Sequence, residues 1–198
     1  MTIEQVKSKY KNGQIPSSAL SPVDTGQLLI KSARDAYMLM KADAKKDGVT
    51  IKLVGPSSAY RKCGEKGDYT KGLSNGVFTQ WYAWELYKAG AGNLASNPTT
   101  SKSCKSNHGW GLAIDVKGST AQKWIKKNGE KYGWWWSGGT FSKIENWHFD
   151  YDIDRDTFRK KINIKALQAG PSKYIMYAVL IGAVISLTYT LVTSIKDK

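Results

Sequence analysis

The chain has 198 residues, which is enough for one well-cored domain of ordinary size and little more. Its formal net charge of +14 favours an acidic partner, such as nucleic acid, anionic lipid or an anionic cell wall. Because the basic residues are scattered along the chain and not concentrated in one run, we expect no specific nucleic-acid partner.

The first third of the chain predicts a polar segment, a helix and a strand. Residues 1–19 are polar and lack the apolar stretch of a cleavable signal peptide. Asp24 can cap a helix that runs to about Lys46 and stops at Gly48. The apolar stripe of this helix would consist of Leu28, Leu29, Ala36, Leu39 and Met40. Residues 49–54 then alternate as a strand.

The middle of the chain predicts two more helices and two more strands. A helix is expected over residues 77–88, with its Trp and Tyr side chains in the core, and a buried strand over residues 112–116. Ser119 and Gln122 match a capping box that opens a helix ending near Asn128. Residues 141–151 can return as a strand. This order predicts an α+β fold, with a small antiparallel sheet and flanking helices.

Residues 174–195 form an uncharged apolar run, which as a helix would measure roughly 33 Å and could cross a bilayer core of about 30 Å. The alternative, a buried core helix, would need a larger protein around it. Small residues recur along the run and could support self-association: Ala178, Gly182 and Ser186. The expected organisation is a polar segment (1–19), a domain (20–155), a basic linker (156–173), a transmembrane helix (174–195) and a short tail (196–198).

Positive charge is more abundant before the predicted span than after it. The residues before it are Arg155, Arg159, Lys160, Lys161, Lys165 and Lys173, and those after it are Lys196 and Lys198. By the positive-inside rule, this asymmetry places the preceding domain in the cytoplasm.

The two cysteines, Cys63 and Cys104, lack the spacing of a metal-binding pair. Both flank segments that we expect to meet at one site, so they can form a disulfide. The other possibility is a pair of inert thiols.

The chain has only two histidines, and each lies close to carboxylates in the sequence. His108 is followed by Asp115 after a glycine-containing turn, and His148 is preceded by Glu145. Catalytic zinc sites use three protein ligands, commonly histidine and carboxylate, and leave one position open for water. His108, Asp115 and His148 supply three ligands and leave Glu145 as a general base, although Asp115 and Glu145 could exchange these roles.

Glu145 can reach the same water only if the chain is irregular before the last strand. A strand that starts near Trp147 places His148 and Asp150 on one face. Glu145 has the opposite parity, so we predict that it lies in a loop or bulge before this strand.

The segment SNHGWGLAID, residues 106–115, and the segment ENWH, residues 145–148, resemble the two paired motifs of the LAS-type zinc peptidases. This family contains D-alanyl-D-alanine carboxypeptidases and phage L-alanyl-D-glutamate endopeptidases and is classed as M15-like. The resemblance implies that His108, Asp115 and His148 bind zinc, that Glu145 is the catalytic base, and that the substrate is a peptidoglycan peptide.

The same family has an arginine in an upstream element that resembles residues 57–61, SSAYR. The resemblance implies that Arg61 contacts a substrate carboxylate or carbonyl, for which a guanidinium is well suited. Ala59 departs from the glycine that is common in this element. Ser106 is similar to the serine beside the first ligand and is expected either to contact substrate or to act only as a turn residue.

The resulting hypothesis is a zinc-dependent peptidoglycan peptidase, either an endopeptidase or a D,D-carboxypeptidase, anchored in a lipid bilayer by residues 174–195. Its substrate lies outside the cytoplasmic membrane, whereas the charge asymmetry keeps the domain inside. A viral origin would resolve this conflict, with the protein in a virion or host cell membrane and acting in wall penetration or lysis by a bacteriophage. The alternative is a non-catalytic virion or membrane structural protein that has a peptidase-like fold and binds the anionic wall.

Overall fold

The computed structural model describes residues 3–70, 78–93, 95–98 and 104–161. Residues 1–157 form one compact unit. Most of the predicted linker, the whole predicted span (174–195) and the tail lie outside the described residues. Within the described part of the chain, no helix combines the length and the apolar character that a membrane crossing requires.

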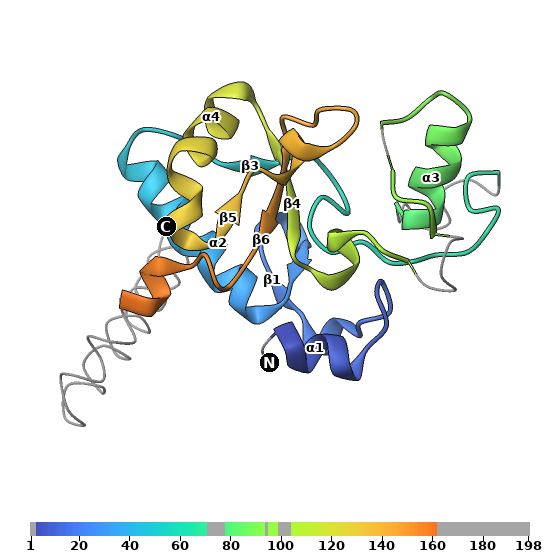
Figure 1. The fold of residues 1–198 in the computed structure, drawn as a ribbon, viewed down its shortest axis with the longest axis horizontal. Helices are drawn as coiled ribbons and strands as arrows, with labels where there is room; N and C mark the ends of the chain where they lie inside the picture. Colours follow the sequence, from blue (N-terminus) through green and yellow to red (C-terminus); the bar gives the residue numbers. More distant parts are fainter. Residues whose placement is uncertain (1–2, 71–77, 94, 99–103, 162–198) are drawn as a thin grey trace, which may run out of the picture. The chain divides into compact units, whose positions relative to one another are not determined.

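An antiparallel sheet of four strands lies at the centre of this unit (Figure 1). The strand order is β3-β4-β6-β5, with β3 at Lys52–Leu53, β4 at Ala113–Lys117, β5 at Trp134–Trp135 and β6 at His148–Tyr151. In the pairing of β4 with β6, Asp115 lies opposite His148. The predicted mixed fold with a small antiparallel sheet is therefore confirmed.

Two strands of this sheet are shorter than the sequence suggested, and a third, β5, was not expected. β6 starts at His148, and not near residue 141, because Ser137–Thr140 form the 3₁₀ helix η7 and the following residues form a loop. β3 is confined to the two residues that pair with Val116 and Lys117. β5 is too short to show any alternation in the sequence.

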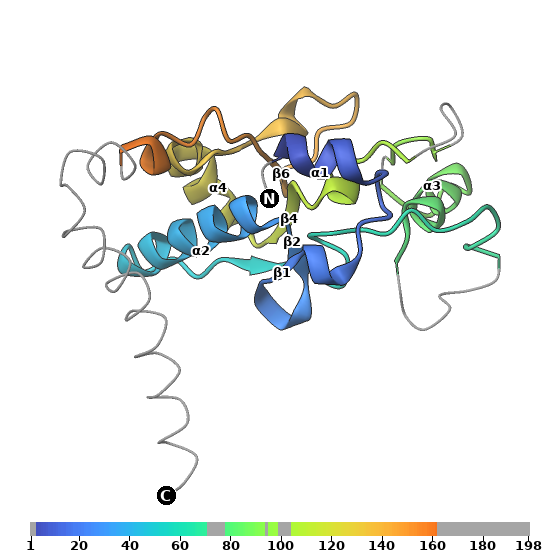
Figure 2. The ribbon, with the colours of Figure 1, turned by 90° about the horizontal axis from the view of Figure 1, so that it is seen from below.

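Helices α2, Lys31–Lys46, and α4, Ser119–Asn128, flank the sheet, and the 3₁₀ helix η6, Gly129–Tyr132, contacts both (Figures 1 and 2). The buried face of α2 has helical spacing: Ala33, Ala36, Tyr37, Met40 and Ala44. The Tyr37 ring packs edge-on against Trp134, with ring centroids 6.4 Å apart. The predicted stripe is correct at Ala36 and Met40, whereas Leu39 is 39% exposed and Leu28 and Leu29 precede the helix, in the strand β2, Leu28–Leu29.

Both predicted helix caps are wrong. α2 begins after Ile30, and Asp24 lies in the 3₁₀ helix η2, Asp24–Gly26, where its carboxylate accepts hydrogen bonds from Tyr37 and Lys41. α4 begins after Gly118 without a side-chain cap. The Gln122 amide instead donates to the carbonyl of Val116, at 2.8 Å.

The N-terminal segment packs into the same unit as the rest of the domain. It forms α1, Ile3–Lys9, and η1, Ser17–Ala19, and leads into a small two-stranded sheet of β1, Ser21–Pro22, and β2, Leu28–Leu29. Val6 and Ile15 are buried. The backbone of Gly13 donates to Gly109, at 2.8 Å, and accepts from Cys63, at 2.9 Å, so this segment contacts the turn at residues 107–111.

Helix α3, Gln80–Lys88, lies apart from the central sheet (Figure 1). It begins two residues after Phe78, where the Thr79 hydroxyl accepts from the backbone of Tyr82 at 3.0 Å. Its aromatic side chains are half-buried. The sequence had predicted that they lie in the core, and this prediction is wrong. Cys63 and Cys104 form a disulfide across a separation of 41 residues, which closes the segment that carries α3.

Candidate metal centre

A tight turn brings His108 and Asp115 to one point. His108 lies in the 3₁₀ helix η5, Asn107–Trp110, and the chain reverses at Gly111 into β4, which carries Asp115. Gly111 has φ +64°, and a Cβ atom there would lie 2.9 Å from the backbone nitrogen of Ile30. Glycine therefore permits both the left-handed conformation and the close packing of this turn.

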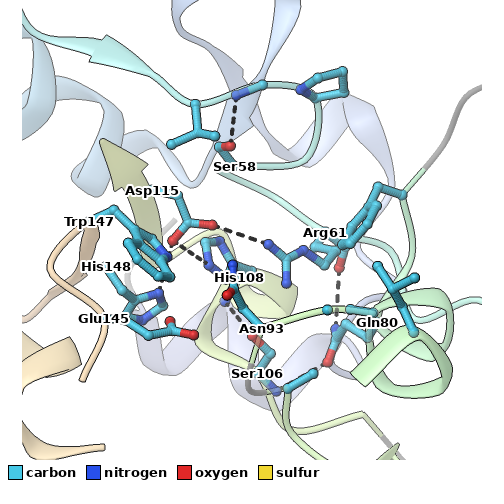
Figure 3. A pocket seen from close by; sticks show the side chains of 18 of the residues that line it. Ser58, Arg61, Gln80, Asn93, Ser106, His108, Asp115, Glu145, Trp147 and His148 are labelled. Atoms are coloured by element: carbon cyan, nitrogen blue, oxygen red, sulfur yellow. Dashed lines mark hydrogen bonds and ion pairs between the residues drawn. The ribbon is translucent and has the colours of Figure 1, made fainter. Parts of the chain in front are cut away.

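His148 completes the group from the neighbouring strand. It is the first residue of β6 and pairs with Asp115 across the sheet. Potential ligand atoms of His108, Asp115 and His148 all lie within 4.8 Å of one another. The three predicted metal ligands are therefore brought together, from a turn and two strands (Figure 3).

Each histidine has one ring nitrogen held by an acceptor outside the group. Nδ1 of His108 donates to the carbonyl of Ala59, at 2.8 Å, and Nε2 of His148 donates to Oδ1 of Asp150, at 3.1 Å. The other two nitrogens face Oδ1 of Asp115, at 3.4 Å for His108 and 3.1 Å for His148. Metal-binding histidines commonly have such outer partners, which fix the tautomer and the ring orientation. The donor set and its outer hydrogen bonds thus fit a zinc ion.

Asp150 is a site residue that the sequence analysis did not assign. The period of two places it on the same face of β6 as His148, and it is buried, with 7% exposure. Burial by itself would raise its pKa, but the hydrogen bond to His148, the charge of His148 and weaker hydrogen bonds together lower it. The signal in the sequence was the pair of a histidine and a carboxylate two residues apart on one strand.

Arg61 lies against the other oxygen of Asp115. Its Nη2 donates to Oδ2 of Asp115 at 3.2 Å, its Nε donates to the carbonyl of Ser57 at 3.3 Å, and the guanidinium lies 5.2 Å from the ring centroid of Phe78. These contacts orient the carboxylate so that its Oδ1 faces the histidines. The expected contact of Arg61 with substrate stays a prediction.

Charges surround the Asp115 carboxylate. Burial by itself would raise the pKa of Asp115, but His108, His148 and Arg61 together hold it far below its usual range. The carboxylate is therefore ionised, as a metal ligand must be.

Glu145 lies in the loop before β6, as the parity argument predicted. Its backbone N–H donates to the carbonyl of Gly138, at 3.0 Å, and its carbonyl accepts from the backbone of His148, at 3.3 Å. A Cβ atom at Gly138 would lie 2.0 Å from this Glu145 oxygen. In Figure 3 the Glu145 carboxylate lies beside His148, at the wall of the pocket. Burial raises its pKa above the usual value.

Ser106 caps the turn that carries His108, and Gln80 holds it in place. The Ser106 hydroxyl accepts from the backbone of His108 at 3.3 Å. The buried amide of Gln80 accepts from the backbone of Ser106, at 3.1 Å, and donates to the carbonyl of Arg61, at 3.2 Å, and to Asn12, at 2.9 Å. Ser106 is thus a turn residue, and its contact with substrate stays a prediction. Nothing in the sequence pattern singled out Gln80.

The three predicted metal ligands, His108, Asp115 and His148, line a pocket of about 790 Å³. One wall comes from α3 and the residues after it, and the other comes from the ends of β3 and β4 and the start of α4. Arg61, Ser106, Asp115, Glu145 and His148 all line it. The pocket is large enough for a peptide segment and contains the whole predicted catalytic group.

No family profile and no curated protein matches the chain. Among solved structures, it is similar to a mutant of the vancomycin-resistance D,D-pentapeptidase VanY in complex with Zn(II), with 18% identity, a TM-score of 0.47, and coverage of 72% of this chain and 85% of that one. It is also similar to VanYB in complex with D-alanine-D-alanine, with 15% identity, a TM-score of 0.46, and coverage of 70% and 80%.

A third similar structure is the LdcB LD-carboxypeptidase, with 19% identity, a TM-score of 0.47, and coverage of 75% of this chain and 76% of that one. The chemistry of this chain follows from its own residues.

Proposed function

We propose that this protein is a zinc-dependent peptidase that acts on peptidoglycan peptides. The observation that carries the proposal is the convergence of His108, Asp115 and His148, with potential ligand atoms within 4.8 Å of one another, in a pocket whose wall also contains Glu145. The resemblance of segments 106–115 and 145–148 to the paired LAS-type motifs supplies the substrate class.

The residues of the pocket have separate roles in this reaction. Zinc, when bound, supplies a Lewis acid for the scissile carbonyl and for water. Glu145, whose pKa is raised by burial, takes a proton from the attacking water and passes it to the leaving amine. Arg61 lies beside the pocket wall with N–H groups suited to an oxyanion or a carboxylate of the substrate. His108, Asp115 and His148 act only as metal ligands.

The disulfide supports a site of action outside the cytoplasm. Disulfides form and persist mainly in oxidising compartments. The Cys63–Cys104 bond joins the segment that carries Arg61 to the segment that carries His108. Two parts of the site are therefore linked covalently by this bond. We therefore propose that the domain functions on the wall side of the membrane, contrary to the orientation that the charge asymmetry favours.

The finer parts of the hypothesis are proposed on the sequence alone. Residues 174–195 would anchor the enzyme in a virion or host cell membrane, and a viral role in wall penetration or lysis would explain how a cytoplasmic product meets its substrate. The reaction would be an endopeptidase or D,D-carboxypeptidase cleavage, and mass spectrometry of the released muropeptides distinguishes the two.

A digestion of purified sacculi tests the proposed activity. Wild-type protein with zinc is expected to release muropeptides, whereas Glu145→Ala with a normal zinc content and chelator-treated wild type are expected to release none. Lys123→Gln, a change of an exposed residue outside the pocket, is the matched control and should behave as wild type. Release that persists in both Glu145→Ala and the chelated protein would exclude the zinc mechanism.

A further inference from the structure

The pocket continues past the metal ligands along β4. Asp115 and Lys117 are alternate residues of this strand, so their side chains share a face and lie about 7 Å apart along it. Lys117 lines the same pocket, together with Val54, Gln122 and Trp147. A peptide bound at the metal ligands therefore has room to extend beyond them, toward Lys117.

A second lysine stands beside Lys117. β3 pairs with β4 so that Lys52 lies directly opposite Lys117. Directly opposed side chains project from the same face of a sheet, with Cβ atoms about 5 Å apart. Val54, which shares the parity of Lys52, lines the pocket. Lys117 thus lines one end of the pocket, and Lys52 projects beside it from the same face of the sheet.

This pair of like charges is unfavourable without an anion. Like charges directly opposite each other on neighbouring strands destabilise a sheet. Within the described residues, neither Lys52 nor Lys117 forms an ion pair or a side-chain hydrogen bond, and both are exposed. A carboxylate placed between them would relieve the repulsion.

The other charges of the pocket do not supply that carboxylate. The acidic residues in its lining are Asp115, which is paired with Arg61, and Glu145, which lies in the loop before β6. The charge of Arg61 is partly offset by Asp115, to which its Nη2 donates at 3.2 Å. An incoming acidic group therefore meets unpaired positive charge at Lys52 and Lys117.

We propose that Lys52 and Lys117 bind a carboxylate on the substrate residue next to the scissile bond, so that the enzyme prefers acidic peptides that run past the metal centre along β4. The proposal rests on the proposed peptidase function, because it assigns the specificity of the same pocket. It makes the two lysines specificity residues and leaves the catalytic roles unchanged.

Paired synthetic peptides test this assignment. They are built around the bond that mass spectrometry shows to be cut, with one pair for each side of it. The members of a pair differ only in a carboxylate or a carboxamide on the residue next to that bond. Wild type is expected to favour the acid of one pair by about fivefold in kcat/KM, mainly through KM. The preference should shrink as salt is added.

The double variant Lys52→Gln/Lys117→Gln is expected to lose this preference while retaining kcat on the carboxamide peptide. Lys123→Gln, on the exposed face of α4, should keep the preference. Thermal unfolding checks the fold, and the double variant should unfold at no lower temperature than wild type because a like-charge pair has been removed. A double variant that still favours the acid overturns the assignment and leaves the peptidase function intact.

A wild type that releases no muropeptides contradicts the proposed function. Acid and carboxamide pairs built on each bond of the stem peptide are then used, and binding decides the role of the lysines. Quenching of Trp fluorescence measures the affinity of the zinc-loaded protein for the same peptides. Tighter binding of the acidic peptide that disappears in the double variant supports the assignment. Equal affinity of the wild type for acid and carboxamide refutes it.

Discussion

Asp115 and His148 face each other across β4 and β6, with Oδ1 of Asp115 3.1 Å from Nδ1 of His148. The same Asp115 oxygen lies 3.4 Å from Nε2 of His108, so one carboxylate oxygen marks the point at which the three ligands meet. The register of two strands, and not the local sequence, thus sets the geometry of the site.

Removal of the outer carboxylate should weaken metal binding. Asp150→Asn leaves Nε2 of His148 without its charged acceptor, at a position where the hydrogen bond measures 3.1 Å. We expect zinc affinity to fall about 10- to 100-fold, the usual effect of losing such a partner. Competition with a chelating dye measures the change. Asp154→Asn, in the exposed turn after β6, is the control and should bind zinc as wild type does.

Apparent zinc affinity should rise with pH. Burial opposes the charge of His148, but its hydrogen bonds to Asp115 and Asp150 raise its pKa from 6.5 to about 9 in the metal-free chain. A proton on Nδ1 competes with the metal, so each pH unit below about 9 should reduce apparent affinity by up to about tenfold. Dye competition at several pH values between 6.5 and 9 measures this slope. A flat profile across this range would contradict the assignment of His148 as a ligand.

The same proton should stabilise the metal-free fold. Because the pKa of His148 is raised, its contribution is fully present below about 6.5 and is lost as the pH rises through about 9. Urea unfolding of chelated protein should therefore show a decrease in the free energy of unfolding over this range. His148→Asn should remove this part of the pH dependence, and its persistence in that variant would assign it to another group.

Loss of the general base should affect the rate and not the metal. Glu145→Gln keeps the shape of the side chain, and we expect kcat to fall by about 10²- to 10⁴-fold with zinc content unchanged. In the wild type the base must be ionised, and burial raises its pKa above 4.5. The rate should therefore decrease with falling pH at a midpoint above this value. Metal analysis, together with kcat measured against pH, tests both statements.

The disulfide should contribute substantially to stability. The loop between Cys63 and Cys104 spans 41 residues, for which the chain-entropy relation gives about 4 kcal/mol. Cys63→Ala/Cys104→Ala is expected to lose about this much free energy of unfolding, measured by urea titration of the zinc-loaded protein. Reductant should shift the wild type toward the double variant and leave the variant unchanged. A wild type unaffected by full reduction would contradict this estimate.

The metal ligands were predictable because the chain has only two histidines and each stands near a carboxylate. The loop position of Glu145 was also predictable, since its parity differs from that of His148. The caps at Asp24 and Ser119 were not, because the expected side chains bond elsewhere: Asp24 accepts from Tyr37, and Gln122 donates to the carbonyl of Val116. The two-residue strand β5 has no periodicity that could indicate it.

The segment before residue 20 holds the turn that carries His108, and this limits how far the domain can be shortened. Asn12 donates to the carbonyl of Ser106, at 2.9 Å, and Gly13 is hydrogen-bonded to Gly109 on the turn that holds His108. A polypeptide that starts at residue 20 would retain every ligand and the base. It would lack the hydrogen bonds from Asn12 and Gly13 that hold this turn. The minimal catalytic fragment therefore includes residues that carry no chemistry themselves, and deletions from the N-terminus should abolish zinc binding before they reach any ligand.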